Sequence, residues 1–245
     1  MVDNVFKSVI TELLALNKGE RISNFEYQGK LYWLKQAEHH TGLMRLLKPH
    51  PLEAIKTEVY ILKNMAAKFA PVPKLVLAEE DFFVVEDVGS TVKQWLTEDD
   101  ISSSSTQQIL NDSAAALAHL HTMNLAHGRP ALRDISWQDG QVTFIDFEAS
   151  QYQKDIEYQQ VRDILVFLHS LYRYLGPLHD LIVPVINSYR QHGGEAIWQR
   201  AALWLRKWQW LYYPVSLFKH RGGRDITPIY WVLRYFRVHE YNAMV

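Results

Sequence analysis

The chain has 245 residues, of which 48% are hydrophobic and 22% are charged, and its formal net charge is −1. This composition is that of a globular protein long enough for one large domain or two smaller lobes. The near-neutral charge argues against a nucleic-acid partner, because nucleic-acid binders usually carry a basic excess. Cysteine is absent, which excludes disulfides and thiolate metal sites.

The N-terminus and the overall hydropathy pattern bear on location. Asp3, Lys7 and Glu12 interrupt the first residues, so this stretch lacks the unbroken apolar core of a signal peptide. No apolar run approaches the roughly 18 residues that a membrane-spanning helix needs. We therefore expect a cytoplasmic protein.

The first part of the chain mixes helical and strand patterns. Apolar residues recur at helical spacing over 4–17, and the stretch 21–36 predicts two strands joined by a tight turn. A second helix is expected over 52–69, followed by two strands within 71–89. The sequence thus predicts a small mixed lobe over residues 1–88.

The remainder, 89–245, is expected to form a mostly helical lobe that contains one hairpin. Asp139-Gly140 is the dipeptide most typical of a two-residue hairpin turn, and alternating apolar residues flank it. A turn of this length predicts three cross-strand pairs: Gln138 with Gln141, Trp137 with Val142, and Ile135 with Phe144.

Two carboxylates meet at the open end of this predicted hairpin. The register sets Asp134 opposite Ile145, which makes Asp134 and Asp146 neighbours. Like charges this close repel unless a cation lies between them. Mg²⁺ suits an oxygen-only site that keeps water ligands and bridges substrate phosphates. The alternative is a pair of solvated aspartates at a loop end.

The order and spacing of His127-Gly128-Arg129, Asp134 and Asp146-Phe147-Glu148 resemble the catalytic and metal-binding loops of the protein-kinase-like phosphotransferases. The pattern of that family is H-x-D-x-x-x-x-N followed by D-F-G. The resemblance implies a two-lobed α+β fold of the protein-kinase type, with a small mixed β/α N-lobe and a mostly helical C-lobe. It also implies ATP and Mg²⁺ as cofactors, with Asp134 and Asp146 as the metal ligands.

Other residues lie where this family places its nucleotide-binding groups. Lys35 closes a strand, like the family lysine that binds the α- and β-phosphates, and Glu58 lies within a helix, like the glutamate that pairs with that lysine. Glu86 and Val88 fall in a stretch similar to the hinge, whose backbone contacts adenine. Asp163 resembles the buried aspartate that braces the catalytic loop. Each residue taken alone is usually solvated, so their common order carries the resemblance.

The sequence departs from the family pattern at several positions. Arg129 replaces the aspartate that orients and deprotonates the acceptor hydroxyl, and a guanidinium stays protonated at physiological pH. Asp134 replaces the metal-binding asparagine, and Glu148 replaces the glycine of D-F-G. No G-x-G-x-x-G loop precedes Lys35, where Gln28-Gly29 predicts a tight turn instead.

Arg129 leaves several hypotheses open. Transfer can proceed without a base while the guanidinium stabilises the transferring phosphoryl group, since this reaction depends mainly on positioning and electrostatics. Alternatively, Arg129 is structural and the protein is a pseudokinase, a nucleotide-binding regulatory scaffold without activity. In a third hypothesis Asp134 is the base and Asp146 alone holds the metal. A fourth is nucleotidyl transfer, for which the sequence gives no positive sign.

The C-terminal stretch 204–237 interleaves aromatic and basic residues. The aromatic ones are Trp204, Trp208, Trp210, Tyr212, Tyr213, Tyr230, Trp231 and Tyr235, and the basic ones are Arg206, Lys207, Lys219, Arg221, Arg224, Arg234 and Arg237. This composition suits contact with a membrane surface that carries anionic headgroups. The alternative is a helical core layer in which the stems of the basic residues cover apolar surface.

Together these features predict an ATP- and Mg²⁺-dependent phosphotransferase that acts on a hydroxyl of a small molecule or glycolipid, with a protein acceptor also open. The chain length and the Arg162-Asp163 pair are similar to those of bacterial lipopolysaccharide-core and sugar-acid kinases. If the C-terminal stretch contacts lipid, the protein is expected at the inner face of a bacterial membrane.

Overall fold

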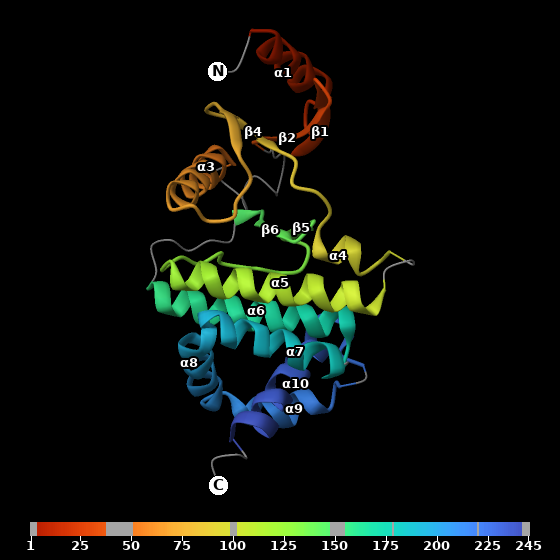
Figure 1. The fold of residues 1–245 in the computed structure, drawn as a ribbon, viewed down its shortest axis with the longest axis vertical. Helices are drawn as coiled ribbons and strands as arrows, with labels where there is room; N and C mark the ends of the chain where they lie inside the picture. Colours follow the sequence, from red (N-terminus) through yellow and green to blue (C-terminus); the bar gives the residue numbers. More distant parts are fainter. Residues whose placement is uncertain are drawn as a thin grey trace. The chain divides into compact units, whose positions relative to one another are not determined.

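The computed structural model describes residues 4–37, 51–98, 102–147, 155–177, 179–219 and 221–241, so Glu148 lies outside the described residues. The chain divides into two compact units (Figure 1). The first comprises residues 1–88 together with 146–148, and the second comprises 89–145 together with 149–245.

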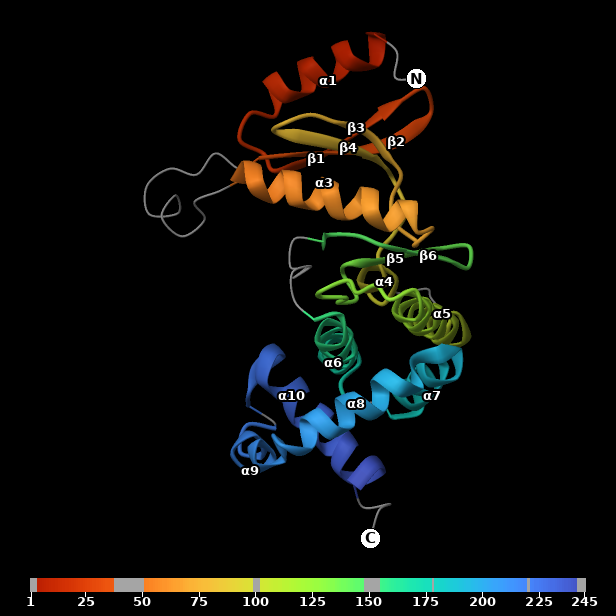
Figure 2. The same ribbon diagram turned by 90° about the vertical axis from the view of Figure 1, so that its left-hand side faces the viewer.

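The first unit is a four-stranded antiparallel sheet with one helix on each face (Figure 2). Its strand order is β1-β2-β4-β3. In chain order the elements are α1 (Asn4–Leu16), β1 (Ile22–Tyr27), β2 (Lys30–Gln36), α3 (Pro51–Ala67), β3 (Leu75–Ala78) and β4 (Phe82–Glu86). The predicted sequence of helix, two strands, helix and two strands is therefore confirmed.

Successive side chains of β2 point to opposite faces of the sheet, toward α1 and toward α3. Leu34 points to the α1 side, where it is fully buried in a cluster with Phe6 and Ile10 of that helix. Because successive side chains of a strand point to opposite faces, Lys35 faces α3. The sheet thus buries an apolar layer under α1 and presents a cation to the other helix.

The turn between β1 and β2 has only two residues. Tyr27 pairs with Lys30, and both Gln28 (φ 51°) and Gly29 (φ 74°) have left-handed backbone conformations. These values are typical of a type I′ hairpin turn, whose twist matches that of the strands. The expected tight turn is confirmed, and it occupies the place of a glycine-rich phosphate loop.

Over its described residues the second unit is formed by helices, connecting loops and one two-stranded ribbon. Its helices of four or more residues are α4 (Val92–Trp95), α5 (Ser103–Thr122), α6 (Ile156–Leu175), α7 (His179–Tyr189), α8 (Glu195–Arg206), α9 (Tyr212–Ser216) and α10 (Gly223–Phe236), with π-helical η2 (Arg190–Gly194) and η4 (Arg237–Tyr241). A 3₁₀ turn, η3 (Gln209–Leu211), precedes α9. In the core α5 packs against α7, and α6 packs against α8 and α10. The predicted α+β class is confirmed.

The ribbon consists of β5 (Ile135–Gln138) and β6 (Gln141–Phe144), and its register is the predicted one. The turn residues Asp139 (φ 49°) and Gly140 (φ 82°) both have positive φ. Beyond the last pair, the Ile145 N–H donates to the Asp134 carbonyl at 3.0 Å. Asp134 therefore lies opposite Ile145 as expected, and Asp146 is the next residue of the chain.

Candidate functional site

An ion pair between Lys35 and Glu58 lies on the α3 side of the first unit's sheet. Lys35 Nζ is 2.9 Å from Glu58 Oε1 and 2.7 Å from Oε2. Glu58 lies on the buried face of α3 with Ile55 and Leu62, three residues before it and four after it, so the helical repeat turns the carboxylate inward. A carboxylate placed on an apolar face requires a partner, and the end of β2 supplies it.

Burial shapes the electrostatics of this pair. Glu58 is only 4% exposed, and burial raises the pKa of its carboxyl above the ordinary value. The positive charge and hydrogen bond of Lys35 oppose that rise, while the negative charge of Asp146 adds to it. The two carboxylates of this cluster thus compete for one ammonium group.

Asp146 completes the cluster, which we name the Lys35 cluster: Lys35, Glu58 and Asp146. Its Oδ1 lies 3.5 Å from Lys35 Nζ. The backbone of Asp146 has φ 63°, in the left-handed region that few residues other than glycine adopt, although aspartate tolerates it better than most. The next residue, Phe147, is buried and anchors the turn. Such a conformation persists only where neighbouring structure imposes it.

The predicted hinge residues Glu86 and Val88 lie at and beyond the end of β4. The Glu86 N–H donates to the Lys74 carbonyl, and the Asp87 N–H donates to the Leu31 carbonyl, each at 3.0 Å. The Glu86 carboxylate also accepts a 2.7 Å hydrogen bond from Lys74 Nζ. An adenine at this strand end would have to use backbone atoms other than these two N–H groups.

A buried aspartate braces the loop around His127 and Gly128 in the second unit. Asp163 of α6 is fully buried and accepts hydrogen bonds from the N–H groups of His127 (2.6 Å) and Gly128 (2.8 Å). Gly128 has φ 100°, a backbone conformation that L side chains rarely adopt. The expectation that Asp163 is buried and braces this loop is confirmed.

His127 ties the same loop to the ribbon. Its Nε2 donates to the Ile145 carbonyl at 2.9 Å, and its Nδ1 accepts from the Arg129 N–H at 3.2 Å. These two bonds require the neutral imidazole with its proton on Nε2. The loop backbone at Arg129 is therefore held from both sides.

Two guanidinium groups flank Asp134 at the end of the loop. Arg129 Nε lies 3.5 Å from Asp134 Oδ2, and Arg133 Nε lies 3.5 Å from Oδ1. Asp134 is 3% exposed, whereas the two arginine side chains are 34% and 51% exposed. The aspartate thus anchors a pair of cations that reach solvent. Sequence reasoning missed Arg133, because the family pattern assigns no role to that position.

A second group of polar residues behind the loop was also missed. His121 Nδ1 lies 2.7 Å from the hydroxyl of Tyr189, and His121 Nε2 lies 3.4 Å from Asp163 Oδ2. Burial raises the pKa of Tyr189, so the phenol stays protonated. The residues lie on α5, α7 and α6, so no spacing within one element could have indicated the contact.

The two predicted metal ligands, Asp146 and Asp134, fit Mg²⁺ unequally. Mg²⁺ keeps several waters and needs only one or two protein carboxylates, a requirement that the partly exposed side chain of Asp146 meets. Asp134 fits poorly, since each of its oxygens already faces a guanidinium group. Among the residues that the structure describes, no group of three or more His, Asp and Glu side chains converges as a metal site.

The small sheet with its Lys35 cluster and the helical unit with its braced loop have the organisation of the protein-kinase-like superfamily. The chain belongs to the lipopolysaccharide kinase (Kdo/WaaP) family, whose model matches residues 14–181. A Haemophilus influenzae protein, described as uncharacterized, is 39% identical over 240 residues, which cover 98% of this chain and 99% of that protein. Within the described ranges no helix is long and apolar enough to cross a membrane.

Proposed function

We propose that the protein is an ATP- and Mg²⁺-dependent phosphotransferase that transfers the γ-phosphoryl group to a hydroxyl of a saccharide, carried by a glycolipid or a small molecule. Membership of the lipopolysaccharide kinase family supports the reaction class. The observation that carries the proposal is the Lys35 cluster, in which one buried ammonium group lies within 3.5 Å of two carboxylates from separate segments of the chain.

Within this proposal, Lys35 binds the α- and β-phosphates while Glu58 holds its ammonium group in place. The pair is buried, so the charge of Lys35 is screened by little water and acts strongly on a nearby phosphate. Glu86 and Val88 are proposed to bind the adenine through their backbone. These are contacts that orient a nucleotide, which is the main task of a protein in phosphoryl transfer.

Asp146 is the proposed Mg²⁺ ligand. Its carboxylate is partly exposed and fixed by an unusual backbone conformation, as a preorganised ligand should be. When bound, Mg²⁺ would bridge phosphate oxygens and neutralise their charge. We assign Asp134 a lesser share in metal binding, because its oxygens face Arg129 and Arg133.

Arg129 is the proposed electrostatic residue at the transferring group. It cannot accept the proton of an acceptor hydroxyl, but its guanidinium can bind the oxygens of a phosphoryl group in a bidentate manner. Asp134 fixes the guanidinium, and the loop backbone is held by Asp163 and His127. A base is dispensable for a loose transition state in which the hydroxyl loses its proton late.

A glycolipid acceptor resides in a membrane, so we extend the proposal to peripheral membrane contact through the aromatic and basic stretch 204–237. The exposed side chains of Trp208, Trp210 and Tyr213 support this part of the proposal. Aromatic side chains with a polar edge favour the boundary between lipid and water.

The second candidate is a pseudokinase that binds nucleotide without transfer. Arg129 in place of the catalytic aspartate favours it, as does the two-residue turn at Gln28-Gly29 in place of a glycine-rich loop. The Lys35 cluster would remain in such a protein, so nucleotide binding alone does not separate the two candidates.

Labelled ATP separates them. The protein is incubated with Mg²⁺, core glycolipids and their deacylated saccharides, and ATP labelled at the γ or the α position. We expect γ-label on a saccharide and its loss in Asp146→Asn. Transfer of the α-label would establish nucleotidyl transfer instead. Mg²⁺-dependent ATP binding without any transfer would establish the pseudokinase, and absence of ATP binding would overturn the whole proposal.

A further inference from the structure

An apolar pocket lies in the second unit among α6, α8, η3 and α10. Its volume is about 300 Å³, at the lower end of the range for small-molecule sites. The walls include Leu165 of α6, Trp204 of α8, Trp208, and Ile229 and Val232 of α10. Such walls suit a hydrocarbon chain. A sugar or nucleotide would lose hydrogen bonds with water there and gain none.

One polar side chain borders the pocket, and it has a structural task. Nε2 of His169 on α6 donates to the backbone carbonyl of Asp225, the third residue of α10, at 2.9 Å. One turn further along α6, Arg173 Nη1 lies 2.6 Å from Asp225 Oδ1. These two contacts join the first turn of α10 to α6.

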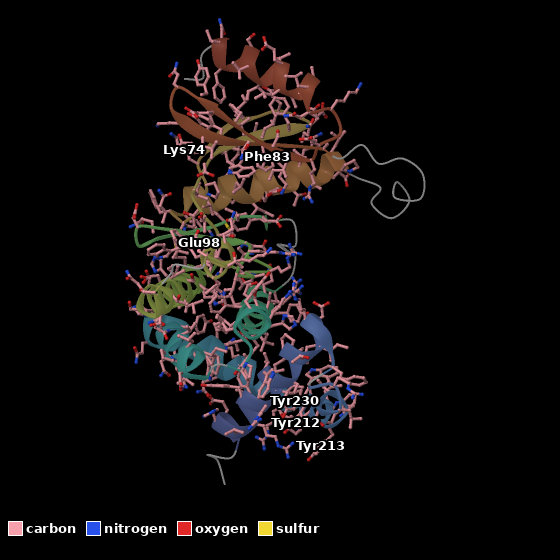
Figure 3. All side chains as sticks on the ribbon, turned by 90° about the vertical axis from the view of Figure 1, so that its right-hand side faces the viewer. Lys74, Phe83, Glu98, Tyr212, Tyr213 and Tyr230 are labelled. Atoms are coloured by element: carbon pink, nitrogen blue, oxygen red, sulfur yellow. The ribbon has the colours of Figure 1, made fainter. Side chains whose placement is uncertain are left out.

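Exposed apolar side chains are frequent in the stretch of the chain that lines most of the pocket. Ten of the eighteen large hydrophobic side chains that are exposed among the described residues fall between Leu203 and Val238. Trp210 is 60% exposed, Tyr213 61% and Leu217 80%. Tyr213 lies with Tyr212 and Tyr230 in Figure 3, where the first two come from α9 and the third from α10. Trp204, Trp208 and Ile229 of this group lie together at the pocket, and exposed apolar side chains that gather on one surface mark a binding face.

The same stretch carries the positive charge of the molecule. Residues 203–241 hold seven Lys and Arg against two Asp and Glu, whereas the rest of the chain holds nineteen against twenty-five. Both acids are already engaged, Asp225 with Arg173 and Glu240 with Arg190.

None of the seven cations of this stretch has a carboxylate partner within the ranges that the structure describes. Six of them, all except Arg237, are exposed, and Arg221 and Arg224 are among these six. Basic side chains next to exposed aromatic ones are complementary to an anionic lipid surface, where each contributes about 1 kcal/mol.

We propose that this pocket takes one acyl chain of an anionic phospholipid from a membrane surface, while Arg221 and Arg224 hold the phosphate headgroups beside it. The inference rests on the membrane contact proposed above and adds a specific chain-binding site to it. It does not depend on phosphoryl transfer, so the two can fail separately. A second copy of the chain, covering the same apolar face, is the competing occupant.

Vesicle flotation tests the proposed binding of anionic headgroups by Arg221 and Arg224. The native chain is expected to float with vesicles of phosphatidylcholine and phosphatidylglycerol at low salt, and not with pure phosphatidylcholine. Arg221→Gln/Arg224→Gln should bind the anionic vesicles at least tenfold more weakly. The matched control, Lys63→Gln/Lys68→Gln, removes two exposed lysines of the first unit and should float like the native protein. Equal flotation with both vesicle types in all variants would overturn the charge assignment.

Fluorescence tests the pocket itself. Phosphatidylglycerol brominated on one acyl chain should quench Trp204 and Trp208, and Trp204→Phe/Trp208→Phe should lose most of that quenching. Ile229→Phe fills the pocket, whereas Ile226→Phe adds the same ring to the same helix outside it, and both parent side chains are 40% exposed. We expect Ile229→Phe to float normally but to show severalfold less quenching, and Ile226→Phe to match the native protein.

Three further results would contradict the proposed acyl-chain pocket or the membrane contact. Quenching that Ile229→Phe leaves unchanged would overturn the chain-binding pocket, and absence of flotation would overturn the membrane contact beneath it. A native dimer that anionic lipid does not dissociate, measured by light scattering, would assign the face to a second copy. ATP titration of the same variants reports on the Lys35 cluster and is expected to be unchanged by either substitution.

Discussion

Glu58 in the first unit and Asp163 in the second are both buried acids, and they are satisfied in different ways. Glu58 of the first unit binds a charged side-chain group, Lys35 Nζ, whereas Asp163 of the second unit binds backbone N–H groups of His127 and Gly128. The first arrangement positions a buried cation, which we propose to be a phosphate-binding group. The second fixes the shape of a loop, independently of which side chain the loop carries at residue 129.

The fixed backbone of this loop is relevant to the role of Arg129. The bonds from Asp163 and His127 fix the backbone around Arg129. Asp134 then holds the guanidinium. The chain therefore presents an arginine with a defined position where the family pattern has a base, in agreement with an electrostatic role.

The largest effect is expected from Asp163→Ala. The substitution leaves two buried N–H groups without their acceptor, and we expect the free energy of unfolding of the second unit to fall by about 4 kcal/mol. Denaturant unfolding followed by fluorescence measures it. Asp163→Asn keeps one acceptor oxygen and should lose roughly half as much. A loss below about 1 kcal/mol in the alanine variant would contradict the bracing role.

The next largest effect is expected from Lys35→Met, because this substitution leaves the Glu58 carboxylate buried without its cation. We expect the first unit to lose about 3 kcal/mol at neutral pH. Lys35→Met/Glu58→Gln should recover part of this loss, since it removes the buried charge as well. Denaturant unfolding of the single and double variants tests the coupling, and equal stability of the two would contradict it.

The pH dependence of the same pair has a definite sign. Burial raises the folded-state pKa of Glu58 above the ordinary 4.5. The stability linked to this proton is fully present below pH 4.5 and is lost as the pH rises through the raised pKa. In Lys35→Met the pKa of Glu58 should rise further. The variant's loss of unfolding free energy relative to the native protein should therefore shrink as the pH falls toward 4.5, the ordinary pKa of a glutamate.

Arg129→Gln should lower the rate of phosphoryl transfer without weakening nucleotide binding. If Arg129 stabilises the transferring group, turnover should fall about a hundredfold, equivalent to roughly 2.7 kcal/mol in the barrier. Nucleotide binding at the Lys35 cluster should stay within about threefold of the native value, because the contact assigned to Arg129 is with the transferring phosphoryl group and strengthens in the transition state. Rate and affinity are measured with the same labelled ATP. A large loss of affinity with an unchanged rate would reverse the assignment.

The smallest effect is expected at the ribbon turn. Gly140→Ala places a side chain at φ 82° in open space, so the cost is conformational strain of about 1 kcal/mol. Gly89→Ala, with φ 81°, would also bring its Cβ within 2.6 Å of Gln138 Oε1 and should cost more. Thermal unfolding ranks the two variants. Equal midpoints would show that Gln138 moves aside freely.

Local patterns predicted much of the fold. Asp139-Gly140 determines the register of β5 and β6 because both residues favour left-handed conformations, and the register in turn sets Asp134 opposite Ile145. The alternation of β2 places Lys35 opposite to Leu34, and the 3.6-residue repeat of α3 turns Glu58 inward. These contacts depend on spacings within single elements, which a sequence displays.

The contacts that were missed join separate elements. Arg133 against Asp134 depends on the path of an irregular loop, and His121 with Tyr189 depends on the packing of α5 against α7. The C-terminal stretch was predicted as either core or membrane surface, and it divides, with Tyr230 and Tyr235 buried while Trp208 and Trp210 are exposed. Which aromatic residues are buried depends on helix packing, and composition does not determine it.

The most direct test of the account is calorimetric titration of ATP, with and without Mg²⁺, into the native protein and Asp146→Asn. Asparagine also tolerates the left-handed backbone at this position, so the variant should fold normally. We predict ATP binding by the native protein that Mg²⁺ strengthens, and at least tenfold weaker binding by Asp146→Asn in the presence of Mg²⁺. Equal affinities of the two proteins, or no binding by either, would contradict the assignment of the Lys35 cluster as a nucleotide site.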